Sequence, residues 1–289
     1  MDIRYTSKDG LSLFAKSYGD PNAPLTALCM HGLTRNHKDF EPMIERLLAD
    51  GLNVRFVAVD VRGRCQSDAD SNLENYTPAV YAGDMVTLLD HLNIDKVVLV
   101  GTSMGGLISM VLMTMIPQRV LGVAMNDIGP ELDPRGLDRI SGYVGGNTTQ
   151  PDWDAAGKAV ASVQSVAFPD YSHDDWVAFA KRTYRQNSDG TLELDYDPAI
   201  GRTVKDVRPT PETNAAMWQL FDAMKAAPLL LFRGELTDLL PAAVAEKMIE
   251  THGNAKLVTV PRVGHAPLLD EDEVASSLTT FFKSLEPSV

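Results

Sequence analysis

Apolar residues follow two alternating patterns along most of this chain. Short apolar runs predict strands at Leu25–Met30, Val54–Val59, Val97–Val100, Val120–Met125, Leu229–Phe232 and Lys256–Val260. Apolar residues at helical spacing predict helices over 40–49, 81–92, 107–115, 241–251 and 271–285. Strands that alternate with helices are typical of a mostly parallel sheet with right-handed crossovers and helices on both faces. The predicted fold class is therefore α/β.

Two stretches depart from this alternation. Ile3 to Thr6 and Leu11 to Tyr18 alternate around a Lys8-Asp9-Gly10 turn, which predicts an antiparallel hairpin at one edge of the sheet. From about residue 131 to 224 strand-like runs disappear and helical stretches predominate, over a length that exceeds a single crossover connection. We therefore predict a first part of an α/β core at 1–129, a helical cap insertion at 130–225 and a second part of the core at 226–289.

The segment Gly101-Thr102-Ser103-Met104-Gly105 joins a predicted buried strand to a predicted helix. A serine at such a tight turn sits in a strained backbone conformation, and residues two before and two after it must lack bulk where strand and helix nearly touch. Gly101 and Gly105 meet that requirement. The alternative is a glycine-rich turn whose serine only caps the helix, but the context favours Ser103 as a nucleophile.

A serine hydroxyl is a weak nucleophile at neutral pH and needs a base within hydrogen-bond reach, held by a third group. His265 follows Gly264 in the loop after the last predicted strand, where it can reach the carboxyl edge of the sheet. Asp238, beyond the preceding strand, and Asp127, after the strand next to Ser103, are the two candidate acids. His31 precedes Gly32 at the same edge and is expected to order that loop.

The negative oxygen of a tetrahedral intermediate needs fixed hydrogen-bond donors. Backbone N–H groups of Met104, at the start of a helix, and of Leu33, just after His31-Gly32, are predicted to form this oxyanion hole. Neither role depends on the side chain.

Composition excludes several classes of protein. The formal net charge of −13 argues against binding to nucleic acids or anionic membranes, which requires a basic face. Two cysteines, Cys29 and Cys65, make no disulfide framework and no cysteine–histidine zinc cluster, and no targeting or membrane-spanning stretch is visible. We expect a cytoplasmic protein that needs no metal or cofactor and takes a small-molecule substrate, with a homodimer left open.

Five segments together resemble the α/β-hydrolase superfamily, in the branch of serine esterases, lactonases and meta-cleavage-product hydrolases. They are His31-Gly32-Leu33-Thr34, Asp60-Val61-Arg62-Gly63-Arg64-Cys65-Gln66-Ser67-Asp68, Gly101 to Gly106, Gly234-Glu235-Leu236-Thr237-Asp238 and Gly264-His265. The resemblance implies the α/β-hydrolase fold with a helical cap that shapes the substrate pockets. The family's order of serine, acid and histidine leads us to favour Asp238 over Asp127. Cys65 stands where the family pattern has a second glycine.

Three functions fit this resemblance. The first is a serine hydrolase that cleaves a carboxylic ester, thioester or lactone through an acyl-enzyme, with Ser103 as nucleophile. The second uses the same residues to cleave a carbon–carbon bond in a vinylogous diketone, and the third is a non-catalytic ligand-binding module. Relatives that open epoxides or displace halides carry aspartate at the position of Ser103, which argues against both reactions. Polar cap residues that could bind a substrate carboxylate, or could simply solvate helix faces, are Arg135, Arg139, Tyr143, Arg182 and Arg185.

Overall fold

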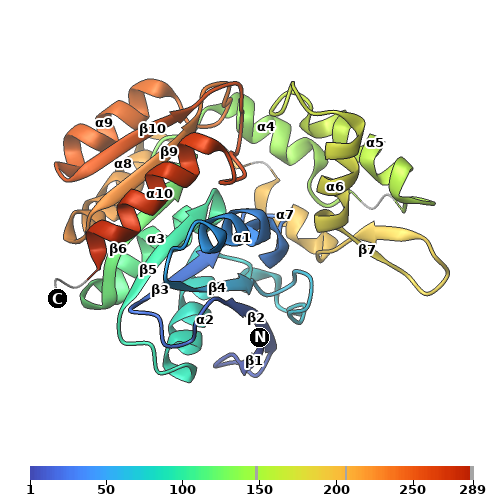
Figure 1. The fold of residues 1–289 in the computed structure, drawn as a ribbon. Helices are drawn as coiled ribbons and strands as arrows, with labels where there is room; N and C mark the ends of the chain where they lie inside the picture. The colour runs from blue at the N-terminus through green and yellow to red at the C-terminus, as the bar shows by residue number, and fades with distance from the viewer. Residues whose placement is uncertain (147–148, 206, 287–289) are drawn as a thin grey trace.

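The computed structural model describes residues 1–146, 149–205 and 207–286. Its main sheet has eight strands in the order β1-β2-β4-β3-β5-β6-β9-β10 (Figure 1). Their bounds are β1 Asp2–Thr6, β2 Ser12–Tyr18, β3 Leu25–Met30, β4 Val54–Asp60, β5 Val97–Thr102, β6 Val120–Asn126, β9 Leu229–Gly234 and β10 Ala255–Val260. The first two strands form an antiparallel hairpin and β2 runs antiparallel to β4, whereas all other pairs are parallel. The α/β fold class and the edge hairpin are confirmed.

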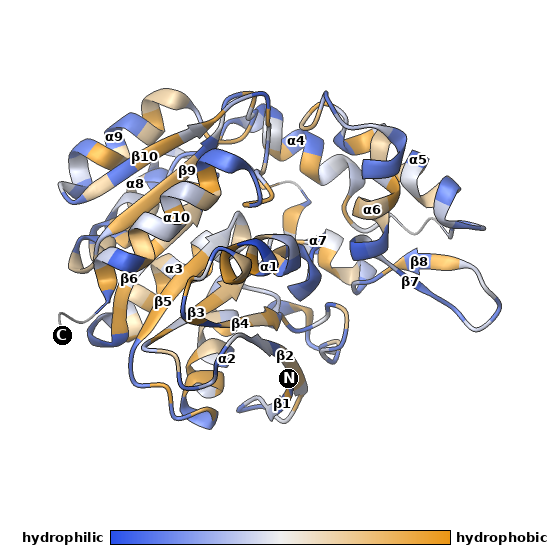
Figure 2. Cartoon of the chain, viewed as in Figure 1, coloured by the Kyte–Doolittle hydropathy of each residue, from blue (hydrophilic) through white to orange (hydrophobic). Residues whose placement is uncertain are grey.

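Helices cover both faces of this sheet (Figure 1). On one face α1 (Glu41–Ala49) and α10 (Asp272–Leu285) pack on the apolar side chains of the central strands. On the other face lie α2 (Pro78–His91), α3 (Met104–Met115), α8 (Pro211–Asp222) and α9 (Ala242–His252). Because both faces are buried, β5 and its neighbours are apolar along nearly their whole length (Figure 2).

The long connection between β6 and β9 adds no strand to the main sheet. It holds α4 (Pro134–Tyr143), α5 (Trp153–Gln164), α6 (His173–Thr183), the hairpin of β7 (Tyr184–Gln186) and β8 (Leu192–Leu194), α7 (Gly201–Val204) and then α8. The helices α5 and α6 and the hairpin share a small apolar core of their own, which includes Phe168, Trp176 and Phe179. In contrast, α8 packs on α3 of the main body.

The division of the chain into core and cap stays a prediction. Within the predicted cap, residues 147, 148 and 206 lie outside the described residues, and 287–289 at the end of the predicted core do so too. Cys29 and Cys65 are free thiols. Of the helices that the structure describes, none combines the length and the apolarity needed to cross a bilayer. The cytoplasmic location stays a prediction as well.

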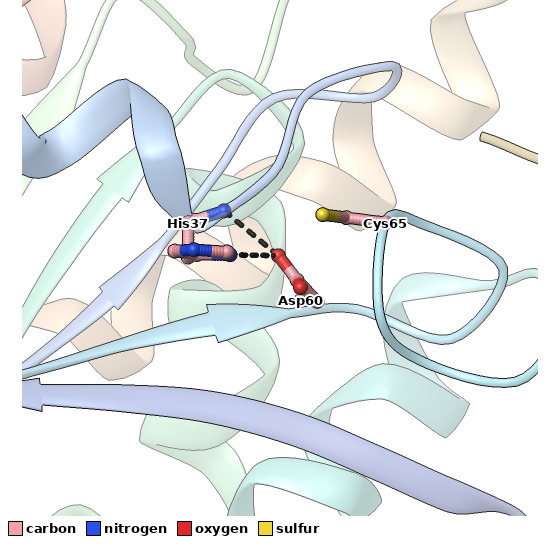
Figure 3. A group of neighbouring side chains, drawn as sticks. All are labelled: His37, Asp60 and Cys65. Atoms are coloured by element: carbon pink, nitrogen blue, oxygen red, sulfur yellow. Dashed lines mark hydrogen bonds and ion pairs between the residues drawn. The ribbon is translucent and has the colours of Figure 1, made fainter. Parts of the chain in front are cut away.

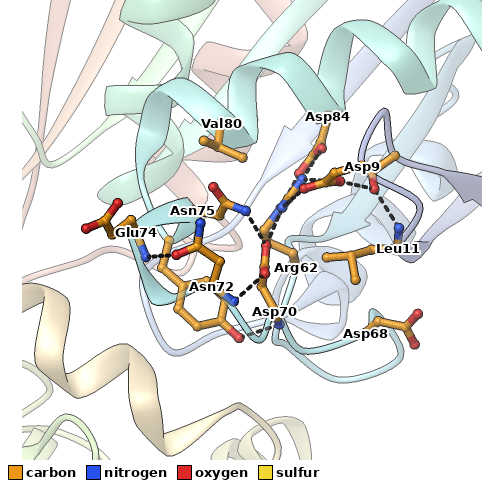
Figure 4. A network of polar contacts seen from close by, with 12 residues as sticks. Asp9, Leu11, Arg62, Asp68, Asp70, Asn72, Glu74, Asn75, Val80 and Asp84 are labelled. Carbon is orange, nitrogen blue, oxygen red and sulfur yellow. Dashed lines mark hydrogen bonds and ion pairs between the residues drawn. The ribbon is translucent and has the colours of Figure 1, made fainter.

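Arg62 ties the edge of the sheet to the helix layer (Figure 4). Its guanidinium is 1% exposed and bonds three carboxylates: Asp84 of α2 in bidentate fashion, Asp70 at 2.6 Å and Asp9 of the β1–β2 turn at 2.8 Å. Hydrogen bonding to Arg62 lowers the pKa of Asp9 to about 2. Burial raises the pKa of Asp84 although Arg62 opposes this shift. The cluster is therefore held by one cation among three anions.

Replacing Arg62 by methionine tests this dependence. The Arg62→Met variant should lower the free energy of unfolding by about 3–5 kcal/mol, because it leaves buried carboxylates without their partner. Urea unfolding at neutral pH measures the change. Arg185→Met removes an arginine from the half-exposed pair with Glu193 and should cost less than about 1 kcal/mol. Equal losses in the two variants would contradict the role given to Arg62.

Candidate active site

Ser103 occupies the tight turn between β5 and α3. Its φ of 52° and ψ of −113° are strained for a residue with a side chain. A Cβ on Gly101 would lie 2.4 Å from the carbonyl oxygen of Gly105, and one on Gly105 would lie 1.9 Å from that of Met30. The Ser103 N–H donates to Asn126 O of the neighbouring strand at 2.9 Å. Close backbone approach therefore explains both glycines of the pattern and presents the serine at the carboxyl edge of the sheet.

His265 lies in the loop between β10 and α10 and points toward this turn. Its Nε2 is 2.9 Å from Ser103 Oγ, and its Nδ1 is 2.8 Å from Asp127 Oδ2. His265 is 9% exposed and Asp127 is fully buried. Hydroxyl, imidazole and carboxylate thus form one hydrogen-bonded series whose imidazole and carboxylate are buried.

Asp127 is fixed from three sides. Besides the His265 ring, the Gly234 N–H donates to its Oδ1 at 3.0 Å and the Thr237 hydroxyl to its Oδ2 at 2.6 Å. Its φ of 56° turns the chain sharply after β6. The carboxylate is therefore oriented before any substrate binds.

The prediction that Asp238 would hold the imidazole is wrong, and the alternative acid Asp127 occupies that position. Asp238 accepts two hydrogen bonds from Arg139 of α4, at 2.5 and 2.7 Å. Burial would raise the pKa of Asp238, but the bonds from Arg139 lower it overall. Arg139, considered above as a site for a substrate carboxylate, is engaged by this internal one.

Sheet order gives the physical reason for this correction. Asn126 pairs with Thr102 across β5 and β6, so that Asp127 follows directly beside Ser103. Asp238 lies four residues past the end of β9, which is one strand farther from β5. Neighbouring strands are separated by about 4.8 Å. Both aspartates lie between Ser103 and His265 in sequence, so the order of the three residue types could not distinguish them.

The predicted backbone donors lie beside Ser103. A Cβ on Gly32 would be 3.8 Å from Ser103 Cβ, which places the Gly32–Leu33 backbone against the serine. Met104 is the first residue of α3, so its N–H has no acceptor within the helix. Burial lowers the pKa of His31 to about 4, and this neutral ring links Gly32 O to the N–H of Val61. His31 orders the loop, as the sequence suggested.

Arg64 supports both backbone donors and had no role in the sequence interpretation. It is fully buried, its Nε donates to Leu33 O at 3.0 Å, and its Nη2 lies 3.5 Å from Met104 Sδ. Further bonds run to Arg62 O and to the Tyr81 hydroxyl. The only signal in the sequence was its membership of the Asp60 to Asp68 segment, because nothing there shows that a charged side chain is buried.

His37, Asp60 and Cys65 form a compact group beneath the same loop (Figure 3). Their candidate ligand atoms lie within 4.8 Å of one another. Asp60 Oδ1 accepts from both the ring and the backbone N–H of His37, and its Oδ2 accepts from Gln66 N. Burial, with Asp60 and Asp195 nearby, raises the pKa of the Cys65 thiol, whereas metal binding requires the thiolate. We therefore interpret the His37–Asp60 pair as a structural contact that holds the loop after β3 against β4.

Cys65 has a φ of 46°. This left-handed conformation is one that glycine adopts readily, which agrees with the glycine of the family pattern at this position. Cys65 adopts this turn, and together with Arg64 and Asp195 it lines a cavity that Ser103 does not border.

Two cavities meet at Ser103. One, of about 80 Å³, is bordered by Ser103, His265 and the Gly32–Leu33 loop, and it shares Thr34, Arg35, Tyr143, Gln164 and Phe179 with a space of about 330 Å³ among α4, α5 and α6. We call these two spaces the cap channel. The other cavity, of about 620 Å³, has Leu33, Ser103, Met104 and Ile140 in its wall and is otherwise mostly aliphatic and aromatic. We call it the apolar chamber.

Arg35 fixes α6 to the loop after β3. Its guanidinium bonds Asp39 twice, donates to the Thr183 hydroxyl of α6, and lies 4.0 Å from the centre of the Phe179 ring. All these contacts are internal. Arg35 therefore forms a fixed part of the cap channel wall.

Glu271 closes the loop that carries His265. Its Oε1 accepts from Leu268 N at 2.9 Å, whereas its Oε2 is buried without a partner among the described residues. Burial raises the pKa of Glu271 to about 7. The charge of the neighbouring Asp270 raises the pKa of Glu271 further. Burial also raises the pKa of Asp270, and the charges of Arg182 and Arg46 oppose that second shift. The folded loop therefore favours the protonated form of Glu271.

Glu271 should make stability depend on pH in a defined direction. The pKa of Glu271 is higher in the folded than in the unfolded protein. Its contribution to the free energy of unfolding is therefore complete below about pH 4.5 and is lost as pH rises through about 7. The loss should reach about 3 kcal/mol at most. Urea unfolding at pH 5 and pH 8 should show that wild type weakens relative to Glu271→Gln, which keeps the acceptor for Leu268 N. The same pH dependence in both proteins would contradict this assignment.

Comparisons with known proteins agree with this geometry. Residues 28–272 match the family described as alpha/beta hydrolase fold. The chain is 35% identical to the 3-hydroxybutyrate-oligomer hydrolase of Cupriavidus necator over 94% of each chain. It is 28% identical to the 2-(acetamidomethylene)succinate hydrolase of Mesorhizobium japonicum, over 82% of this chain and 80% of that protein. The crystal structure of an alpha/beta hydrolase from Novosphingobium aromaticivorans is similar with a TM-score of 0.89, at 38% identity and 98% coverage of both chains.

Proposed function

Since this chain belongs to the α/β-hydrolase family and is a hydrolase, we propose that it cleaves carboxylic esters of small molecules through an acyl-enzyme on Ser103. The observation that supports this most directly is the series from Asp127 through His265 to Ser103, with bonds of 2.8 and 2.9 Å. It supplies a nucleophile, a base and an orienting acid in hydrogen-bond contact.

In the first half of the reaction, His265 Nε2 removes the proton from Ser103 Oγ as the oxygen attacks the ester carbonyl carbon. Asp127 holds the imidazole through Nδ1 and stabilises its positive charge. The tetrahedral intermediate collapses when its C–O bond to the alcohol breaks and His265 gives its proton to that oxygen. Water then adds to the acyl-enzyme by the same steps in reverse, which releases the acid and restores Ser103.

The developing oxyanion would lie against the N–H groups of Leu33 and Met104. One such donor typically contributes about 10²–10³ in rate. Arg64 acts here as a positioning residue, because it holds the Leu33 carbonyl and contacts the Met104 side chain without reaching the serine.

An ester is the substrate class that one full-length relative favours. The relative from Cupriavidus necator is named for oligomers of a hydroxy acid, whose units are joined through ester bonds. The match to that protein covers 94% of each chain. A carboxylic ester therefore stands ahead of the thioester, the lactone and the carbon–carbon bond that the sequence left open.

Loss of Ser103 tests the proposal. Wild type should hydrolyse p-nitrophenyl butyrate and react with a fluorophosphonate probe, whereas Ser103→Ala should lose the labelling and at least about 10³-fold in kcat. Thermal unfolding checks that the variant is folded. A folded wild type that neither hydrolyses short esters nor takes the label would instead favour a ligand-binding module.

Substitutions of the two aspartates should have very different effects on kcat. Asp127→Asn should lower kcat by about 10³–10⁴-fold, because an amide cannot hold the required imidazole tautomer. Asp238→Asn should cost less than about tenfold and should match Arg139→Gln, since both only weaken the same ion pair. Steady-state hydrolysis of p-nitrophenyl butyrate measures all three. A larger loss for Asp238→Asn than for Asp127→Asn would overturn the assignment.

A further inference from the structure

The catalytic serine separates two spaces of different chemistry. The cap channel and the apolar chamber share only Leu33, Ser103 and Ile140 among the described residues that line them at the serine. An ester bound at Ser103 has two halves, the acid part and the alcohol part. The two spaces therefore give room for one half each.

The position of His265 decides which half enters which space. The alcohol oxygen must receive a proton from His265 Nε2 when the tetrahedral intermediate collapses. His265 borders the cap channel, together with Ala266, Pro267 and Leu268, but it does not border the apolar chamber. The alcohol part must therefore leave through the cap channel.

The oxyanion donors point to the other half. The carbonyl oxygen would lie against the N–H groups of Leu33 and Met104. Met104 borders the apolar chamber and not the cap channel, whereas Leu33 borders both. Three of the four bonds of the tetrahedral carbon lead to Ser103 Oγ, to the oxyanion and to the alcohol oxygen. The fourth bond leads to the acid part, which then extends into the apolar chamber. The four directions at the tetrahedral carbon are then all assigned.

We propose that the apolar chamber binds the acid part of the ester and the cap channel its alcohol part. This inference rests on the proposed ester hydrolysis. The substrate class that fits is an ester of an apolar acid with a polar alcohol.

The chamber suits an apolar chain. Its volume of about 620 Å³ falls in the range of cavities that enclose a whole small ligand. Most of its wall is aliphatic or aromatic, including Leu107, Ile128, Leu132 and Leu137. Glu74 and Arg202, the charged residues in the wall as described, are exposed side chains and so lie at the mouth.

The cap channel suits a polar group. Gln164 and Tyr143 border both parts of it, and Thr34 and the Arg35–Asp39 pair lie along the same wall. An alkyl chain that covers Gln164 would offer it no hydrogen bond in return, whereas the Arg35–Asp39 pair is already satisfied internally. The channel wall also includes apolar side chains such as Phe168, Phe179 and Val160, so the channel is mixed in character but accepts a polar alcohol part better than the apolar chamber does.

Two isomeric esters test the assignment in the wild-type protein. Ethyl octanoate and octyl acetate have the same composition, but the long chain lies on the acid side in the first and on the alcohol side in the second. Ethyl octanoate should be cleaved with a kcat/KM at least about tenfold higher, since burying several methylenes gains more in the larger and more apolar chamber. The rate is measured as acid released at constant pH.

Two variants should each lower the preference for ethyl octanoate, and a control variant should leave it unchanged. Leu137→Trp partly fills the chamber and should lower the preference for ethyl octanoate at least about fivefold. Gln164→Leu removes a polar group of the channel and should lower the preference by raising the rate on octyl acetate. Met115→Trp adds the same bulk at an exposed site on α3 and should leave the ratio as in wild type.

The outcomes separate the two levels of the proposal. If octyl acetate is cleaved as well as or better than ethyl octanoate while a fluorophosphonate probe labels Ser103, the assignment of the two spaces is overturned and ester hydrolysis stands. If neither ester is cleaved and Ser103 takes no label, the proposed function fails and the inference fails with it. The comparison of the two esters with the wild-type protein tests the assignment even if Leu137→Trp does not fold.

Discussion

Hydrogen bonds from Asp127 through His265 to Ser103 join three loops at the carboxyl edge of the sheet. Each bond requires that β5, β6 and the segment after β10 keep their positions to within a fraction of an ångström. The sheet meets that requirement with rigid, buried strands, and the backbone contact from Ser103 N to Asn126 O locks two of them at the site itself. The left-handed conformations of Ser103 and Asp127 then point both side chains inward. Two strained residues are thus held by the buried strands of the sheet.

Supporting contacts surround this series on every side. His31 and Arg64 order the Gly32–Leu33 loop from below, and the Arg62 cluster anchors the segment that carries Arg64. Arg139 of α4 bonds Asp238 in the loop after β9, and Arg35 in the loop after β3 bonds Thr183 of α6. The buried arginines are structural partners of carboxylates and carbonyls. The same scaffold that fixes the reacting groups therefore also shapes the two spaces on either side of Ser103.

Much of this arrangement follows from the sequence. Apolar periodicity identified the strands and helices of the main body, and Gly101, Ser103 and Gly105 identified the turn because steric limits leave few residue types that fit there. His265 could be placed because parallel strands end at one edge. Asp238 was preferred wrongly, since chain order is blind to the order of strands in the sheet, which brings Asp127 next to Ser103. Arg64 and Arg62 were also beyond prediction, because the burial of an arginine depends on partners from distant segments.

The central claim is that Asp127 orients His265, and proton NMR in water tests it most directly. A proton on His265 Nδ1 that is shared with a buried carboxylate should resonate well downfield of the backbone amides, and its loss in His265→Gln would assign it. The account predicts that this resonance disappears in Asp127→Asn and persists in Asp238→Asn. Its persistence in Asp127→Asn together with its loss in Asp238→Asn would contradict the account.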